Sequence, residues 1–309
     1  MKKIISNLTL CIIILTACDK IEISEAPNTE PNIHTGWHSS MNGKIVCDGK
    51  SFYSKTMQKC IIIFDLNGKD IIPLPDNIMS INKGIELSPD GSQIAFASWS
   101  KGIFVMNLED TTFEQLFPDS AVTGYEFVGA TWSPNGNKLA FAQQSGSLAK
   151  TYVIDPYTLQ IEFYRTVGIK VSSLDWSPDS PEILIELYTE YLHPSELKLL
   201  NPDNGFLNSF MDSAVYHPVW SHSGTMIAYS KLRSFKGNLI YMVDKEITES
   251  TKVADFYEKG FEVYCKDIAW SPDDKMIAIA SSKGIFITDL MGNLITKLEV
   301  EECSNIDWQ

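Results

Sequence analysis

The stretch Trp132-Ser-Pro-Asn-Gly136, followed by Leu139-Ala-Phe-Ala142, decides the fold of this 309-residue chain. Proline at the second place of a turn presets φ, and Asn followed by Gly then closes the turn. The short apolar run behind the turn has the composition of a buried β-strand. Together they predict a strand, a tight turn and a second strand.

The same pattern recurs along the chain. Its other turns are Leu87-Ser-Pro-Asp-Gly91, Trp176-Ser-Pro-Asp-Ser180, Trp220-Ser-His-Ser-Gly224 and Trp270-Ser-Pro-Asp-Asp274. A degenerate copy begins at Trp37, and a last fragment is Ile306-Asp307-Trp308. The anchors at 37, 87, 132, 176, 220, 270 and 308 are spaced by 38 to 50 residues, and six of the seven tryptophans occupy them. Internal repetition at this period is typical of propellers and related arrays.

Each repeat reads as four short strands without a helix signal. In the sixth copy the expected strands are 267–270, 276–281, 285–290 and 294–300. Four strands in 40 to 50 residues are typical of one propeller blade. We therefore predict an all-β, six-bladed propeller over residues 37–309. Its ring is closed by Ile306–Trp308, which serves as the innermost strand of the first blade and hides the sheet edges.

These copies resemble the repeat of TolB-type propellers. That repeat runs Trp-Ser-Pro-Asp-Gly, then an Ile-Ala-Phe strand, then an Ile-Tyr-Val-Met-Asp strand. The third run appears here as Ile103-Phe-Val-Met-Asn107, Thr151-Tyr-Val-Ile-Asp155, Ile240-Tyr-Met-Val-Asp244 and Ile285-Phe-Ile-Thr-Asp289. The resemblance spans nearly all of residues 37–309. It implies a WD40-like, six-bladed fold and says little about function, because such propellers serve many roles.

The first residues resemble a bacterial lipoprotein signal peptide. A basic start and an apolar stretch too short to span a bilayer end in Leu15-Thr16-Ala17-Cys18, which is similar to a lipobox. The resemblance implies cleavage after residue 17, acylation of Cys18 with chains such as palmitate, and stable attachment to a membrane. Polar residues 18–36 then form a flexible tether. The alternative is an ordinary secretory signal with a chance cysteine.

The expected location is therefore the bacterial cell envelope, with the propeller on the extracytoplasmic side of a membrane or periplasm. The formal net charge is −14, and it becomes −16 once residues 1–17 are removed with Lys2 and Lys3. A surface this acidic repels phosphate backbones, so we expect no nucleic-acid partner. A cation, a basic peptide or a neutral sugar is easier to accommodate.

Four cysteines besides Cys18 remain in the mature chain. Cys265 and Cys303 each lie five residues before an anchor tryptophan, and Cys47 and Cys60 flank one hairpin of the first blade. In an oxidising compartment these spacings predict the disulfides Cys265–Cys303 and Cys47–Cys60. The alternative is four buried thiols that act as small apolar side chains. The absence of closely spaced cysteine pairs argues against a zinc site.

Candidate binding residues gather where the predicted loops of one propeller face meet the channel. They are Trp99, Tyr188, Tyr191, His193, His217, Arg233 and Asp267. Exposed aromatic side chains beside charges favour contacts with proteins or sugars. The carboxylates Glu86, Asp175, Asp267 and Asp307 lie near the channel ends of innermost strands, where a ring of them could hold Ca²⁺. The alternative for these carboxylates is turn capping, and we expect no other cofactor or metal.

The sequence favours a non-enzymatic binding or scaffolding module for a protein, peptide or glycan. It contains no Gly-x-Ser-x-Gly nucleophile motif, no phosphate loop and no cluster of metal ligands, and we assign no catalytic residue. The alternative is an enzyme with its site in the channel, such as a polysaccharide lyase or hydrolase. A propeller that braces a larger envelope complex is a third hypothesis that the sequence does not separate from the first.

Overall fold

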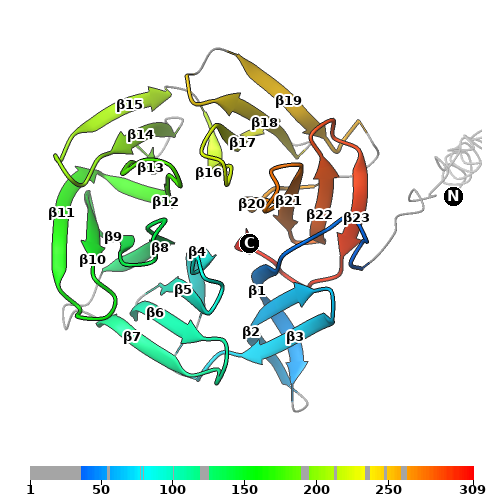
Figure 1. Ribbon diagram of the computed structural model, residues 1–309, viewed down its shortest axis with the longest axis horizontal. Helices are drawn as coiled ribbons and strands as arrows, with labels where there is room; N and C mark the ends of the chain where they lie inside the picture. The colour runs from blue at the N-terminus through cyan, green and yellow to red at the C-terminus, as the bar shows by residue number, and fades with distance from the viewer. Residues whose placement is uncertain are drawn as a thin grey trace, which may run out of the picture. The chain divides into compact units, whose positions relative to one another are not determined.

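The structure, a computed structural model, describes residues 36–309 except 54–55, 77, 79, 100, 119–124, 189–194, 212–213, 234–236, 247–248 and 259–262. Its described residues form six four-stranded antiparallel sheets arranged as blades around a central channel (Figure 1). No helix is present among them, and so none that could cross a membrane. The predicted all-β, six-bladed propeller is confirmed.

The first three blades follow the chain from the N-terminal side. Blade 1 contains β24 (Ile306–Trp308), β1 (Ile45–Tyr53), β2 (Thr56–Asp65) and β3 (Gly68–Pro73). Blade 2 contains β4 (Ile81–Leu87), β5 (Gln93–Ser98), β6 (Gly102–Asn107) and β7 (Phe113–Pro118). Blade 3 contains β8 (Glu126–Trp132), β9 (Leu139–Ser145), β10 (Leu148–Ile154) and β11 (Ile161–Gly168).

The other three blades repeat this order from the innermost to the outermost strand. Blade 4 contains β12 (Lys170–Trp176), β13 (Ile183–Tyr188), β14 (Glu196–Leu200) and β15 (Leu207–Met211). Blade 5 contains β16 (Tyr216–Trp220), β17 (Met226–Leu232), β18 (Asn238–Asp244) and β19 (Ser250–Asp255). Blade 6 contains β20 (Asp267–Trp270), β21 (Met276–Ser281), β22 (Gly284–Asp289) and β23 (Leu294–Leu298).

The Ile-Ala-Phe-Ala pattern of the second strands explains how the blades pack. Side chains alternate between the two faces of a strand, so each blade presents one face to each neighbour. In β5, Ile94 and Phe96 are buried in the junction with blade 1, whereas Ala95 and Ala97 are buried in the junction with blade 3. β9 repeats this arrangement one blade further on. Large residues of one blade therefore meet the small residues of the blade before it.

The ring closes as the repeat count predicts. β24 pairs with β1, with Ile45 opposite Trp308 and Cys47 opposite Ile306. Trp37, which marks the degenerate first copy, lies outside any strand and packs against the core between blades 1 and 6. The reason is that Trp308 of β24 already occupies the innermost anchor position of blade 1.

The Ser-Pro turns define one end of the channel, which we call the turn end. In the turn of blade 2 the Ser88 hydroxyl donates to Asp90 Oδ1 (2.6 Å) and accepts the Gln93 N–H (2.9 Å). Gly91 adopts φ +69°, a conformation that favours glycine. The opposite end, where Trp99 follows β5, is the loop end. The predicted signal peptide, Cys18 and tether up to residue 35 lie outside the described residues.

Candidate functional site

A groove of about 410 Å³ lies at the loop end of blades 2, 3 and 4. Its volume falls within the usual range of about 300–1,000 Å³ for ligand sites. The Trp99 side chain in its wall is 50% exposed, although its loop is fixed by a hydrogen bond from the Phe127 N–H to the Trp99 carbonyl (3.0 Å). We call this the Trp99 groove; it is lined by Asn82, Lys83, Trp99, Glu126, Val128, Gln144, Gly146, Ile169, Lys170, Val171, Ser172 and Tyr188.

The polar wall of the Trp99 groove is held in place by its own hydrogen bonds. Gln144 Nε2 donates to Glu126 Oε2 (3.0 Å), and Gln144 Oε1 accepts the Val171 N–H (2.8 Å). Lys170 Nζ lies 3.9 Å from the same Glu126 oxygen. Side chains fixed in this way lose little conformational entropy when a ligand binds.

Lys83 forms the floor of the groove and reaches across the channel. Its Nζ lies 3.1 Å from His217 Nδ1 in blade 5 and 3.2 Å from the Lys266 carbonyl oxygen. Lys83 and His217 both have positive φ, at +51° and +54°. Both residues lie within register shifts of their innermost strands, between Ile81 and Ile85 and between Tyr216 and Val219, which account for this uncommon conformation.

A buried carboxyl group lies next to this pair. Glu186 Oε2 accepts the His217 N–H (3.1 Å) and the Ser173 hydroxyl (3.0 Å). Its other oxygen, Oε1, is buried without a hydrogen-bond partner among the described residues. Burial raises the pKa of Glu186, and nearby Lys83 partly opposes this rise. An unpaired buried acceptor needs an explanation, and an incoming donor is one.

The environment keeps His217 neutral. Burial lowers the pKa of His217 well below its usual value, and the Lys83 ammonium lowers it further. Nδ1 therefore accepts a hydrogen bond from Lys83. On the same side, burial raises the pKa of the Tyr188 hydroxyl to about 12, with a contribution from Glu186. Tyr188 and Lys83 both line the groove, whereas the buried Glu186 does not.

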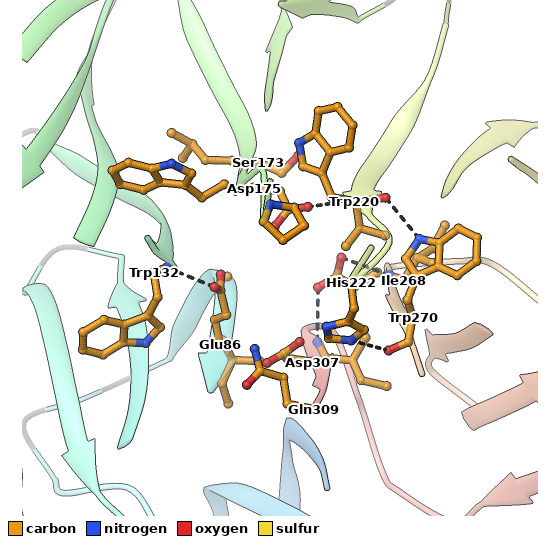
Figure 2. A pocket seen from close by; sticks show the side chains of 18 of the residues that line it. Glu86, Trp132, Ser173, Asp175, Trp220, His222, Ile268, Trp270, Asp307 and Gln309 are labelled. Carbon is orange, nitrogen blue, oxygen red and sulfur yellow. Dashed lines mark hydrogen bonds between the residues drawn. The ribbon is translucent and has the colours of Figure 1, made fainter. Parts of the chain in front are cut away.

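A second cavity of about 440 Å³ opens at the turn end, and we call it the channel chamber (Figure 2). Lys83 borders this chamber as well as the Trp99 groove, so its side chain separates the two. The chamber contains all four carboxylates expected near the channel. Its lining includes Lys83, Glu86, Ser173, Asp175, His222, Asp267, Asp307, Gln309 and the turn residues Pro89, Pro134, Pro178 and Pro272.

The chamber carboxylates connect adjacent blades. Where a polar residue precedes an anchor, its side chain accepts the anchor N–H of the next blade. Asp307 Oδ2 accepts the Leu87 N–H (2.8 Å), and Glu86 Oε1 accepts the Trp132 N–H (3.0 Å). Thr131 and Asp175 accept the anchor N–H groups of the next two blades in the same way, and Figure 2 shows the Glu86–Trp132 and Asp175–Trp220 bonds.

The remaining two junctions use other groups, because Val219 and Ala269 replace the acceptors. Trp270 Nε1 donates to the Val219 carbonyl (3.2 Å). Asp267 Oδ2 accepts the Ile306 N–H (3.1 Å). His222 Nε2 lies 2.9 Å from the Trp308 carbonyl and 3.2 Å from that of Trp270, so this nitrogen carries the proton.

Burial raises the pKa values of several chamber carboxyls and so favours their uncharged form. It raises the pKa of Asp175 to about 8 and that of Asp267 to about 7. The pKa of Glu86 also rises well above its usual value because of burial and the nearby Asp307 and Asp175 carboxylates. No group of three or more His, Cys, Asp or Glu side chains among the described residues lies close enough to hold a metal ion. The geometry thus assigns these carboxyls to capping N–H groups between blades.

The residues expected to form one binding face are divided among several places. Trp99 and Tyr188 line the Trp99 groove. His217 and Asp267 lie near Lys83 inside the channel. Arg233 pairs with Asp255 and stacks over a tyrosine ring of blade 5. Tyr191 and His193 lie outside the described residues.

Lys83 and Glu186 were not among the residues predicted from the sequence. One signal for Lys83 was available: it lies four residues before the anchor of its repeat, and Lys266 occupies the same position in blade 6. Comparing the channel position across repeats would have selected both lysines. Glu186 had a similar signal, since Asp48 holds the same second-strand position in blade 1.

All four propeller cysteines are free, buried thiols in the structure, and neither expected pair is bonded. Cys265 lies in the core between blades 5 and 6, whereas Cys303 lies in the core between blades 6 and 1. Equivalent repeat positions thus face successive junctions rather than each other. The neighbour of the Cys303 thiol is Cys47. Both expected pairings stay predictions.

No protein-family model matches the chain, and no curated protein matches its sequence. Its fold is similar to that of several solved structures. TolB from Acinetobacter baumannii has a TM-score of 0.65 at 18% identity, covering 86% of this chain and 66% of TolB. The chain therefore spans just under two thirds of TolB.

Two further solved structures share the fold. The structure of a nidogen/laminin complex gives a TM-score of 0.64 at 7% identity, covering 86% of this chain and 97% of the other. An oligogalacturonate lyase in complex with manganese gives 0.56 at 12% identity, with coverages of 82% and 78%. At these identities the similarity shows the fold alone. At that level the chain has the TolB-type, six-bladed propeller architecture that its repeats predict.

Proposed function

We propose that this protein is a membrane-anchored lipoprotein of the cell envelope whose propeller binds a ligand without transforming it. The Trp99 groove is the observation that carries the proposal. It combines an exposed tryptophan, a half-buried tyrosine and prearranged polar groups in a cavity of ligand size. Aromatic walls with fixed polar groups are typical of binding sites for protein segments, peptides and glycans.

Lys83 gives the floor of the groove a hydrogen-bond donor, and the buried Glu186 carboxyl lies near it without lining the groove. The Lys83 ammonium contacts two neutral acceptors, and no carboxylate among the described residues lies within ion-pair distance of it. Glu186 has an oxygen that accepts no hydrogen bond from them. A ligand that places an acceptor at the base of the groove can bind the Lys83 ammonium.

The anchoring part of the proposal rests on Leu15-Thr16-Ala17-Cys18. It is tested separately by growing cells with a radiolabelled palmitate precursor. The wild-type protein is expected to carry label and to sediment with membranes, and Cys18→Ser is expected to lose both. An unlabelled wild-type protein in the soluble fraction would reject the anchor without affecting the groove.

The binding part is tested by affinity capture from detergent-solubilised envelopes, using the intact lipoprotein as bait. A ligand of the groove is expected to be captured by the wild type and lost with Trp99→Ala. Tyr157→Ala is the matched control, because Tyr157 is 68% exposed on the outer side of blade 3 and does not line the groove. Tryptophan fluorescence titrations with oligosaccharides provide the parallel test for glycans.

Two outcomes would redirect the proposal. Capture that survives Trp99→Ala would move the binding site to another surface and favour a bracing role in a larger complex. Failure of both proteins and oligosaccharides to bind would remove the support that the groove gives to a binding module.

The second candidate function is a channel-sited enzyme that acts on a polysaccharide. The observation that favours it is the group of titratable side chains around Lys83, namely His217, Glu186 and Asp267. Perturbed pKa values in one cleft are common at catalytic sites, although structural networks also produce them. An enzyme would release shorter or unsaturated sugars from a polysaccharide, and His217→Gln would abolish that release. Unchanged polysaccharide after prolonged incubation would count against the enzyme and favour a non-enzymatic module.

A further inference from the structure

The closure of the propeller depends on a very short strand. β24 has three residues and forms three residue pairs with β1. Beyond it, the chain continues alongside β1, where the Lys50 N–H donates to the Glu301 carbonyl (3.0 Å). Closing strands hold a propeller ring together, so any additional link at this seam has a large effect on the whole fold.

Asp48 shows how closely the two segments are joined. Its Oδ1 accepts the N–H groups of Ser304 and Asn305, both at 2.7 Å, and its Oδ2 accepts Asn305 Nδ2 (2.9 Å). Residues 303–305 are therefore fixed against residues 47–48. The Cys303 side chain lies at the centre of this contact.

The side chains of Cys47 and Cys303 point into the same core. Ile45 and Cys47 alternate with Val46 along β1, and they face the junction of blades 1 and 6. Cys303 is buried in that junction, and both cysteines have no exposed surface. Burial raises the pKa of the Cys303 thiol well above its usual value, and the adjacent Cys47 thiol raises it further.

We propose that Cys47 and Cys303 form a disulfide that fastens the C-terminal segment to β1 and locks the ring. A thiolate of one cysteine attacks a small-molecule disulfide such as oxidised glutathione, which releases one glutathione thiol. The second cysteine then attacks the mixed disulfide and releases the other. Two protein thiols are oxidised to one S–S bond while one glutathione disulfide is reduced to two thiols.

Burial determines when this reaction takes place. The thiolate is the attacking species, and both thiols are sealed from solvent in the closed ring. The bond therefore forms before β24 has docked or while it is transiently detached. Once formed, it closes a loop that contains most of the chain, which is where a cross-link restricts the unfolded state most.

The other pairings are less well placed. Cys265 lies on the far side of blade 6, where its thiol donates to the Asp267 carbonyl (3.5 Å). Cys60 shares the core with Cys47, but it lies on β2, opposite Gly49 rather than Cys47. Cys60 is the free thiol that would remain beside the bonded pair.

The test supplies its own oxidant, so its outcome does not depend on where the cell places the chain. The intact lipoprotein is reduced, equilibrated in a glutathione redox buffer, denatured, alkylated and digested for mass spectrometry. The expected product joins the peptides of Cys47 and Cys303 and leaves Cys60 and Cys265 alkylated. The oxidised protein is expected to melt about 5–10 °C above the reduced one.

Variants separate this bond from the alternatives. Cys303→Ala is expected to abolish the difference in melting temperature between oxidised and reduced protein, and Cys265→Ala is expected to keep it. Alkylation of all four thiols after oxidation would overturn the proposal in favour of buried free thiols. A Cys47–Cys60 or Cys265–Cys303 cross-link would overturn it in favour of the pairings that the sequence suggests.

Discussion

The two ends of the channel use similar polar residues in different ways. At the turn end, Glu86 and Asp175 each accept the N–H of an anchor residue in the next blade. At the loop end, the Lys83 ammonium contacts neutral groups, and one oxygen of Glu186 has no hydrogen-bond partner among the residues that the structure describes. The two carboxylates at the turn end thus cap backbone N–H groups, whereas Glu186 Oε1 at the loop end has no partner among the described residues.

Position in the repeat accounts for the capping at the turn end. Glu86, Thr131, Asp175 and Asp307 all precede an anchor, so a recurring position performs a recurring structural task. The loop-end residues recur in fewer blades: Asp48 of blade 1 holds the repeat position of Glu186, and Tyr188 of blade 4 holds that of Trp99. Repeat position alone therefore does not separate functional from structural polar residues, even where both have perturbed pKa values.

The largest expected effect concerns Trp99. Replacing Trp99 by alanine removes an aromatic anchor from the groove wall and is expected to weaken ligand binding by about 2–4 kcal/mol. The free energy of unfolding is expected to change by less than about 0.5 kcal/mol, because the side chain is half exposed. Titration of the captured ligand and denaturant unfolding measure the two quantities. A large loss of stability with unchanged affinity would mean that Trp99 is structural.

The next effect tests the turn end. Asp175→Ala leaves the Trp220 N–H without its acceptor and is expected to lower the free energy of unfolding by about 1–3 kcal/mol. Asp175→Asn retains an acceptor oxygen and is expected to lose less than half of that. Neither variant should alter binding in the Trp99 groove. Equal destabilisation by both variants would contradict the capping role.

Much of the fold could be predicted because the same pattern of turns and strands recurs in the repeats. The strands at 267–270 and 276–281 match the structure, and the third and fourth strands of that blade differ by one and two residues at their ends. The closing role of Ile306–Trp308 followed from counting the anchors. Repetition averages out local ambiguity, so these predictions did not depend on any single residue.

The site could be predicted only in part. Trp99 stood out as a tryptophan outside the repeat, and it does line the groove. Lys83 has one signal in the sequence, its shared repeat position with Lys266, but its partner His217 is 134 residues away and no local pattern links the two. Arg233 was a reasonable candidate from its loop, but Asp255 of the same blade pairs with it. Contacts between blades are not encoded in local sequence.

The third prediction concerns the pH dependence of stability. The pKa values of Asp175 (about 8) and Asp267 (about 7) are raised by burial in the folded state, so that state holds these protons more tightly than the unfolded chain. The stability that these two protons contribute is therefore fully present below about pH 4, falls progressively above it, and is lost once the pH has passed about 7 for Asp267 and about 8 for Asp175.

Between pH 6.5 and 8 the free energy of unfolding is expected to fall by up to about 1.4 kcal/mol per pH unit for each proton involved. Unfolding at several pH values measures this slope. Asp175→Asn removes one titrating group and is expected to flatten it. A wild-type stability that stays constant or rises across this window would show that the chamber carboxyls are ionised in the native protein.

The smallest effect tests the side chain that separates the two ends. Lys83→Met removes a positive charge that lowers the pKa values of His217, Glu186 and Asp267. All three pKa values are expected to rise, which NMR titration of the His217 ring and of the carboxyl carbons can follow. Lys170→Met is the matched control, since Lys170 lines the groove but approaches Glu126 instead.

The stability of Lys83→Met is expected to stay within about 1 kcal/mol of the wild type. The variant loses two hydrogen bonds to neutral acceptors, but it also no longer places an ammonium group inside the channel, and these changes oppose each other. A residue that changes three titrations and little else belongs to the electrostatics of a site rather than to the scaffold. If the His217 titration in Lys83→Met matched the wild type, Lys83 would not lie across the channel in solution, and the groove and the chamber would be one continuous opening.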